Sequence, residues 1–421
     1  MKKFLLILTV AACAACGRND LSDITVVPFP NDVEVLAGDF NAAGAAFHYS
    51  AEMDQQSVNL VEAFAAKLSL VTSKESEVAE GTGETGFVFA VNAELPEEAY
   101  TLSVDRKCAR VEASSLRGFN YAIQTIKQML PVEIYAKTPA SADWTIPCVK
   151  INDAPRFGYR GLHLDESRHF FGMEEVKRYL DIMEVHKLNT LHWHLTDDQG
   201  WRIEIKKYPE LTSVGSKRSG TCVKKDFKST DGVPYGEGMW YTQDQVREII
   251  AYAAAKGIDV IPEIDLPGHM LAALTAYPEL GCTGGPYEVR TKWGIADEAL
   301  CAGKETTYEF LQNVLSEVCD LFPGEYIHIG GDEAVKKDWE VCVNYQKRMQ
   351  EEGMEHKNEL QGYLVRRIET FLRERGRTVI GWDEIVETGL PEQAVVMSWR
   401  GTPGGIKASA EGHDVIMSPN S

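Results

Sequence analysis

The alternation of apolar and polar positions divides the chain into two parts with different rhythms. After residue 147, short apolar runs typical of buried strands alternate with longer segments whose apolar residues recur at helical spacing. Seven of these runs fit strands, at 159–164, 190–195, 259–264, 326–329, 378–381, 394–398 and 414–417. Repeated strand–helix units predict parallel strands, and seven of them favour a (β/α)8 TIM barrel over a doubly wound sheet.

Two helices of this second part carry start signals. Thr242 and Gln245 fit a capping box ahead of an apolar stripe, and Gly257 stands where that helix would end. Thr306 and Glu309 fit the same pattern ahead of another stripe. The pattern therefore predicts helices that begin at these two threonines.

The first part has a different pattern. Short β-like runs, such as 87–91 and 99–104, are followed by an amphipathic helix at 118–130, which is typical of a small α+β domain. We therefore expect an α+β companion domain at 32–150 and a barrel at 151–421. The residues before them divide into an expected signal peptide at 1–16, whose pattern is described below, and a tether at 17–31.

Composition and charge narrow the class of protein. The 421 residues are 44% hydrophobic and 25% charged, a globular composition that excludes a disordered chain, a collagen-like fibre and a coiled coil. Lys and Arg number 43 against 63 Asp and Glu, which gives a net charge of −20. Because a phosphate backbone repels such a chain, we expect no nucleic-acid partner.

The N-terminus has the pattern of an export signal. Lys2 and Lys3 precede an apolar run too short to span a bilayer, and small residues surround Cys13 and Cys16. The stretch resembles a bacterial lipobox, with Cys16 the preferred lipidation site and Cys13 also fitting. A plain cleaved signal is the alternative. We expect a lipid-anchored protein of the bacterial cell envelope, in the periplasm or at the outer membrane, whose anchor is its only membrane contact.

Seven cysteines follow the signal, without a C-x-x-C pair or a spacing typical of zinc sites. Cys282 and Cys301 flank a glycine-rich loop and are the best candidates for a disulfide in an exported chain. Buried free thiols are an equal alternative.

Polar and aromatic residues gather where the predicted barrel strands end. They include His163, Asp165, Arg168, His192, His194, Asp197, Glu263, Asp265, His269, Asp332, Glu333, Trp382 and Trp399. The active site of a TIM barrel lies at the C-terminal ends of its strands, so we expect these side chains to share one mouth. Indole rings stack on the apolar face of a pyranose, while carboxylates and guanidinium groups bind its hydroxyls. The combination predicts a sugar site.

Several motifs carry a resemblance to a known family. His-Ile-Gly-Gly-Asp-Glu at 328–333, His-Trp-His-Leu-Thr-Asp-Asp-Gln at 192–199 and Pro-Glu-Ile-Asp-Leu-Pro-Gly-His at 262–269 resemble family 20 glycoside hydrolases, the β-N-acetylhexosaminidases. The resemblance covers most of the chain after about residue 30, with the motifs in the family's order. It implies an exo-acting, retaining enzyme that removes terminal N-acetylglucosamine or N-acetylgalactosamine from glycans without a cofactor.

The resemblance also implies roles for individual residues. Glu333 would be the general acid and base, and Asp332 would orient the substrate's acetamido group, which replaces an enzyme nucleophile in this family. The substrate-binding residues that it implies are Arg168, Asp197, His269, Trp382 and Trp399.

Two other interpretations fit parts of the strand ends. His192 and His194, two residues apart on one strand, would fit a metal-dependent barrel hydrolase, but the fifth and sixth strand ends carry no further histidine. The sequence therefore favours catalysis without a metal. Asp383 and Glu384 fit a solvated helix start and a site role equally.

The last predicted strand is the seventh, whereas a closed barrel of this kind needs eight. The family places a Tyr, an Asp, a Trp and a further acid of the site beyond this strand. We therefore expect the 421 residues to be a C-terminally truncated piece of a longer enzyme. The alternative is a non-catalytic glycan-binding lipoprotein or an inactive fragment.

Overall fold

The computed structural model describes residues 20–419, in two compact units. One unit comprises residues up to Gly158 together with Glu184–Lys187 and Ala255–Gly257, and the other comprises the remaining residues from Tyr159 onward. Strand β7 of the first unit runs from Thr145 to Asp153, past the expected domain boundary at residue 150. The expected signal peptide and its Cys16 lie outside the described residues.

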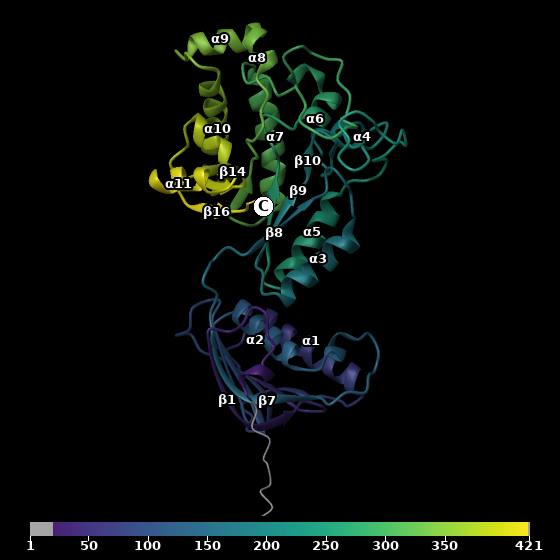
Figure 1. Cartoon of the computed structure of the whole chain (residues 1–421), viewed down its shortest axis with the longest axis vertical. Coiled ribbons are helices and arrows are strands. Elements are labelled where there is room, and N and C mark those ends of the chain that lie inside the picture. Colours follow the sequence, from purple (N-terminus) through teal and green to yellow (C-terminus); the bar gives the residue numbers. More distant parts are fainter. Residues whose placement is uncertain (1–19, 420–421) are drawn as a thin grey trace, which may run out of the picture. The chain divides into compact units, whose positions relative to one another are not determined.

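The first unit contains a seven-stranded sheet of order β1-β7-β5-β6-β4-β2-β3. Its strands are β1 (Asp32–Asn41), β2 (Phe47–Tyr49), β3 (Val78–Glu80), β4 (Gly86–Val91), β5 (Tyr100–Val104), β6 (Cys108–Ala113) and β7 (Thr145–Asp153). Helices α1 (Gln55–Thr72) and α2 (Leu116–Met129) pack on this sheet, and their apolar residues share one core with it (Figure 1). The mixed parallel and antiparallel pairing agrees with the α+β expectation.

The second unit contains a seven-stranded parallel sheet of order β16-β15-β14-β13-β12-β9-β8, in which chain order and sheet order coincide. Its strands are β8 (Gly161–Asp165), β9 (Thr190–His194), β12 (Asp259–Glu263), β13 (Tyr326–His328), β14 (Thr378–Trp382), β15 (Val395–Ser398) and β16 (Val415–Met417). All seven predicted strands are confirmed to within two residues at either end. The curled parallel sheet is that of a (β/α)8 barrel, and within residues 20–419 its edges are β8 and β16.

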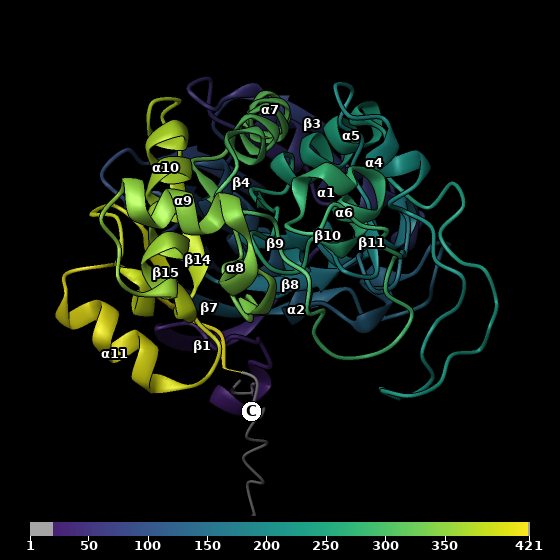
Figure 2. The same ribbon diagram turned by 90° about the horizontal axis from the view of Figure 1, so that it is seen from above.

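Helices follow most strands of this sheet and lie around it, as Figure 2 shows for α5, α7, α10 and α11. They are α3 (Met173–Val185), α4 (Glu210–Ser213), α5 (Gln243–Ala254), α6 (Leu271–Ala276), α7 (Glu305–Leu321), α8 (Lys337–Val341), α9 (Val343–Glu351), α10 (Lys357–Arg373) and α11 (Thr402–Ala410). A short hairpin, β10 (Thr196–Asp197) with β11 (Gly200–Trp201), follows β9. No helix in the described part of the chain is both long and apolar enough to span a membrane.

The two predicted helix starts have different outcomes. The capping box before α5 is confirmed, because the Thr242 backbone N–H donates to Gln245 Oε1 and the Gln245 N–H donates to Thr242 Oγ1. The box at Thr306 is wrong, since α7 already begins at Glu305 after Lys304. The neighbouring hydroxyl of Thr307 instead donates to the backbone oxygen of Cys301 and ties the helix to the preceding loop.

The proposed bridge between Cys282 and Cys301 is also wrong. The seven cysteines of the described chain are free thiols, and the sulfur of Cys301 faces Cys342 at 3.5 Å. Free thiols were the alternative, although a third cysteine beside the pair was not foreseen.

Candidate active site

A pocket of about 580 Å³ opens at the C-terminal ends of the parallel strands. All seven predicted catalytic and substrate-binding residues line it, namely Arg168, Asp197, His269, Asp332, Glu333, Trp382 and Trp399. The parallel sheet explains this convergence, because strands that start at one edge all deliver their following residues to the other. The pocket is also lined by His163, His194, Gln199, Phe227, Asp265, Trp293, Gly294, Ile295 and Ser418.

Arg168 is held in a fixed orientation by acceptors on two strand ends. Its Nη1 donates to Asp165 Oδ2 at 2.9 Å, its Nε donates to Gln199 Oε1 at 3.0 Å, and its Nη2 lies 2.7 Å from Asp197 Oδ2. Because the guanidinium is planar, three such contacts determine where its edge points. The group can therefore present a positioned donor to an oxygen in the pocket.

Glu263, at the end of β12, is a fully buried carboxylate surrounded by histidine ring nitrogens and one indole N–H. His194 Nδ1 lies 2.5 Å and His192 Nε2 2.8 Å from its Oε2, while His328 Nδ1 lies 3.1 Å from Oε1. The Trp382 indole N–H also donates to Oε1 at 2.8 Å. Burial raises the pKa of Glu263, but the charge of the neighbouring His194, whose own pKa is raised well above its usual range, outweighs burial and holds the pKa of Glu263 well below its usual range. Glu263 therefore stays ionised and fixes the ring of Trp382.

His269 connects the carboxylates of two strand ends. Its Nδ1 lies 3.1 Å from Asp197 Oδ1, and its Nε2 lies 3.4 Å from Glu333 Oε2 and 3.6 Å from Asp332 Oδ2. Burial lowers the pKa of His269, but Asp197 outweighs burial and raises the pKa well above its usual range. The protonated ring places a positive charge between the two acids and the rest of the network.

The loop after β13 turns sharply to bring the two acids into the pocket. Gly330, Gly331 and Glu333 have φ angles of 66°, 99° and 45°, all in the left-handed region. A Cβ at Gly330 would clash with the Asp265 carboxylate, whose Oδ1 accepts the Gly331 N–H. Glycine is thus required at position 330. Glu333 adopts a backbone conformation that is unfavourable for residues other than glycine.

Asp332, which lines the pocket, has an unused acceptor. Its Oδ1 is buried and has no hydrogen-bond partner among residues 20–419. Burial raises the pKa of Asp332, although His269 opposes this effect. A buried acceptor without a donor is costly, so a site that retains one is suited to a donor that arrives with the substrate.

Trp382 and Trp399 form part of the pocket wall, each held through its indole nitrogen. Trp399 donates to Glu384 Oε2 at 3.0 Å, and burial raises the pKa of Glu384 to about 7. Asp383 is 2% exposed and pairs with Arg400 at 3.1 Å. Asp383 and Glu384 do begin a short 3-10 helix, η4 (Asp383–Thr388), so the predicted helix start is confirmed, but its solvation is wrong because Asp383 is buried and Glu384 is 15% exposed.

Three groups beside the pocket, all within the described residues, bring possible metal ligands within 4.8 Å of one another. They are His163, His192 and Glu263; Asp197, Asp198 and His269; and Asp265, His269 and Asp332. Arg168 and His269 already balance the charge of Asp197. Catalysis without a metal stays a prediction.

Sequence reasoning did not assign roles to several residues that shape the site. Glu263 and Asp265 lie in a recognised motif, but their burial and their partners depend on strands far away in sequence. Trp293 and Ile295 line the pocket from a loop without regular structure, so no periodicity marks them. Adjacent aromatic and glycine residues were the only local signal.

Comparisons with known proteins agree with this geometry. Residues 157–421 match the model of the glycosyl hydrolase family 20 catalytic domain, and residues 23–154 match that of glycosyl hydrolase family 20, domain 2. A beta-hexosaminidase of Porphyromonas gingivalis is 45% identical over 351 residues, which are 83% of this chain and 44% of that protein. A beta-hexosaminidase of Vibrio furnissii is 38% identical over 402 residues, 95% of this chain and 64% of that protein. The chain thus spans less than two thirds of the length of these relatives.

Solved structures give the same result. The beta-N-acetylhexosaminidase of Bacteroides fragilis has a TM-score of 0.78 at 34% identity, covering 93% of this chain and 74% of that one. The N-acetyl-beta-hexosaminidase of Streptomyces plicatus, solved in complex with Thio-NAglucal, has a TM-score of 0.81 at 30% identity over 94% of this chain and 74% of that one. Matches to both family models, which together span nearly all of the described residues, place this chain in glycoside hydrolase family 20.

Proposed function

We propose that the protein is an exo-acting, retaining β-N-acetylhexosaminidase that removes terminal N-acetylglucosamine or N-acetylgalactosamine from glycans. The observation that carries this proposal is the unpartnered Oδ1 of Asp332, next in sequence to the more exposed acid Glu333. An acetamido N–H supplies the donor that this oxygen lacks. The family and the named relatives support the same activity.

In the proposed mechanism, the substrate provides its own nucleophile. Asp332 accepts the acetamido N–H and directs the carbonyl oxygen to C1, while Glu333 protonates the departing glycosidic oxygen. The C1–O bond to the leaving group breaks as the new C1–O bond closes an oxazolinium ring, whose positive charge Asp332 stabilises. Glu333 then removes a proton from water, which opens the ring at C1 and restores the original configuration.

The other pocket residues have binding and positioning roles in this scheme. The oriented guanidinium of Arg168 binds ring hydroxyls, and Trp382 and Trp399 pack against the sugar and its acetamido group. Asp197 acts through His269, whose Nε2 faces both acids. Phe227 and Trp293 add apolar surface to the pocket.

The two acids can be tested separately with aryl N-acetylglucosaminides. Glu333→Gln should lower kcat by about 10³-fold, the usual contribution of general acid–base catalysis. Asp332→Asn should cause a comparable loss on substrates that bear an acetamido group. Glu392→Gln, an exposed substitution away from the pocket, is the matched control and should retain activity. Unchanged turnover in either acid variant would refute the mechanism.

The length of the chain requires one further comparison. Because it covers 44% and 64% of the two bacterial relatives, activity should be measured for these 421 residues and for any longer gene product. Sugar binding without hydrolysis by the longer product would favour the glycan-binding alternative.

We further propose that Cys16 anchors the protein by lipid in a bacterial envelope. The support is the export pattern of residues 1–16, which lie outside the described structure. Incorporation of a labelled fatty acid should occur in the wild type and Cys13→Ser but not in Cys16→Ser. Equal labelling of both variants would contradict the assignment.

A further inference from the structure

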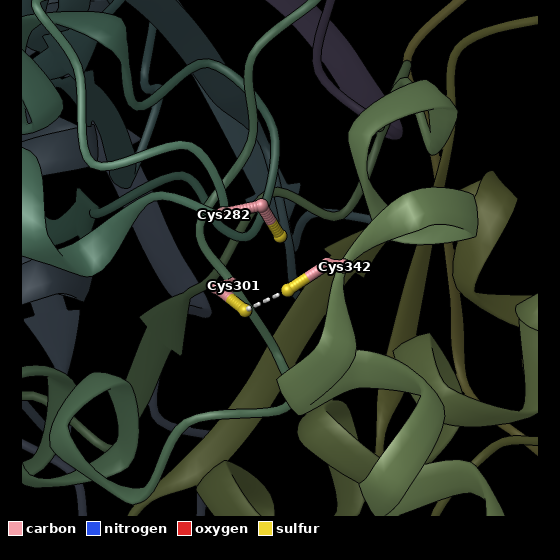
Figure 3. A group of neighbouring side chains, drawn as sticks. All are labelled: Cys282, Cys301 and Cys342. Atoms are coloured by element: carbon pink, nitrogen blue, oxygen red, sulfur yellow. Dashed lines mark hydrogen bonds between the residues drawn. The ribbon is translucent and has the colours of Figure 1, made fainter.

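Three cysteines from distant parts of the second unit meet away from the acidic pair. Cys282 follows the short helix Pro278–Leu280, Cys301 ends the same long loop, and Cys342 connects α8 to α9 (Figure 3). Their sulfur atoms lie within 4.8 Å of one another, and Cys301 and Cys342 are separated by 3.5 Å. Cys301 and Cys342 are buried, whereas Cys282 is partly exposed. The cluster is therefore accessible from one side.

Backbone contacts fix the two loop cysteines independently of any ligand. Gly281 pairs with Leu300 in an isolated antiparallel bridge, and the Cys301 N–H donates to the Leu280 oxygen at 2.8 Å. These contacts hold the beginning and the end of the loop together. The two thiols are thus placed side by side before anything joins them.

The third thiol is placed by a buried tryptophan. The Trp339 indole N–H donates to the Leu300 oxygen at 3.0 Å, and the Cys342 N–H donates to the Trp339 oxygen at 3.2 Å. Trp339 is fully buried and packs against Tyr345 with ring centroids 5.2 Å apart. A preorganised group of three thiols results.

The spacing of the sulfurs suits a shared ion. Zinc–thiolate bonds of about 2.3 Å place two sulfurs of one site roughly 3.8–4.0 Å apart, close to the separation between Cys301 and Cys342, whereas a disulfide needs about 2.05 Å. Lys304 adds a positive charge nearby, since its Nζ donates to the backbone oxygens of Glu279 and Gly281. That charge offsets part of the negative charge of three thiolates.

We propose that Cys282, Cys301 and Cys342 bind a thiophilic cation, Zn²⁺ or a similarly soft ion, through three thiolates. On binding, each thiol releases one proton to solvent and forms one sulfur–metal bond, and a water molecule completes a tetrahedral site. The ion does not take part in glycoside hydrolysis. It fastens both ends of the loop that carries Trp293 and Ile295, two residues of the pocket wall, to the segment that follows Asp332 and Glu333.

Cadmium titration of the reduced 421-residue chain under anaerobic conditions tests the site. We expect one Cd²⁺ per chain, a sulfur-to-metal charge-transfer band, and a higher melting temperature on binding. Cys301→Ser and Cys342→Ser should each lose the band. Cys222→Ser, which changes a partly exposed cysteine outside the cluster, should keep it.

A second measurement on the wild type covers the case in which a serine variant fails to fold. X-ray absorption of the cadmium-loaded chain should count three sulfur ligands. Two or fewer sulfurs, absence of stoichiometric binding by the reduced chain, or an unchanged band in Cys301→Ser would each overturn the proposal. The proposal would also be overturned by a chain that is isolated with an intramolecular disulfide, and is therefore two mass units lighter, if the same chain does not bind Cd²⁺ once the disulfide has been reduced. None of these outcomes depends on hexosaminidase activity.

Discussion

The pocket has two walls that differ in how their charges are paired. In what we call the paired wall, the lining residues Arg168, His194 and Asp197 pair with one another and with the fully buried Glu263 at distances of 2.5–2.9 Å. In the open wall, formed by Asp332 and Glu333, His269 Nε2 lies 3.4 Å from Glu333 and 3.6 Å from Asp332, and one oxygen of Asp332 has no partner among residues 20–419. The polar groups of the paired wall hydrogen-bond to one another and fix its shape. The open wall retains a free acceptor, which our proposal assigns to the substrate.

The largest expected effect comes from breaking the paired wall. Glu263→Gln removes a fully buried charge on which His192, His194 and His328 converge, so it should lower the free energy of unfolding by about 3–5 kcal/mol. Urea denaturation measures this change. Glu288→Gln, on an exposed carboxylate, is the control and should cost little. A loss below about 1 kcal/mol for Glu263→Gln would mean that the paired wall does not stabilise the fold.

A second substitution tests the support beneath the open wall. Gly330→Ala adds a Cβ that clashes with Asp265 at a φ of 66°, and should cost about 2–4 kcal/mol of stability and most of the activity. Gly412→Ala is a matched control, because Gly412 also has a positive φ, 91°, but open space around it. Equal effects of the two variants would show that backbone strain alone, without the clash, explains the loss.

Glu384 allows the comparison to be sharpened by pH. Its pKa in the folded chain is about 7, raised by burial from 4.5, so the folded state binds the proton more tightly than the unfolded state does. Because the side chain is only 15% exposed, wild-type stability should fall by about 2.5 kcal/mol as pH rises from about 4.5 to 7. Glu384→Gln should remove this slope in urea denaturation measured across the same range. A slope that persists in the variant would assign it to other groups.

The smallest expected effect concerns the pocket aromatic that Glu384 holds. Trp399→Phe keeps a ring but loses the N–H that donates to Glu384, and should raise KM about fivefold, equivalent to about 1 kcal/mol. The double variant with Glu384→Gln provides a mutant cycle. Strictly additive effects on KM would mean that this hydrogen bond does not position the tryptophan.

The sequence predicts the barrel well because each strand and helix is marked by a pattern within its own few residues. Each strand is an apolar run followed by polar residues, and parallel pairing brings those residues together without any knowledge of tertiary contacts. Positions such as Arg168 and Trp399, 231 residues apart in sequence, can therefore be assigned to one pocket from their place after a strand.

What the sequence does not predict depends on contacts between distant segments. The burial of Asp383, the histidines around Glu263 and the meeting of Cys342 with the loop cysteines all depend on how neighbouring elements pack. The misplaced start of α7 has the same origin, because the loop contact of Thr307 competes with a local capping pattern at Thr306.

The left-handed backbone of Glu333 also bears on how such an enzyme evolves. A non-glycine residue at a φ of 45° costs about 1–2 kcal/mol, so the position would fold better as glycine. Selection for stability alone would thus remove the acid, and its presence records selection for chemistry against folding. Glu333→Gly should accordingly melt at a higher temperature than Glu333→Gln while both lack activity, which would make the strain at this acid directly measurable.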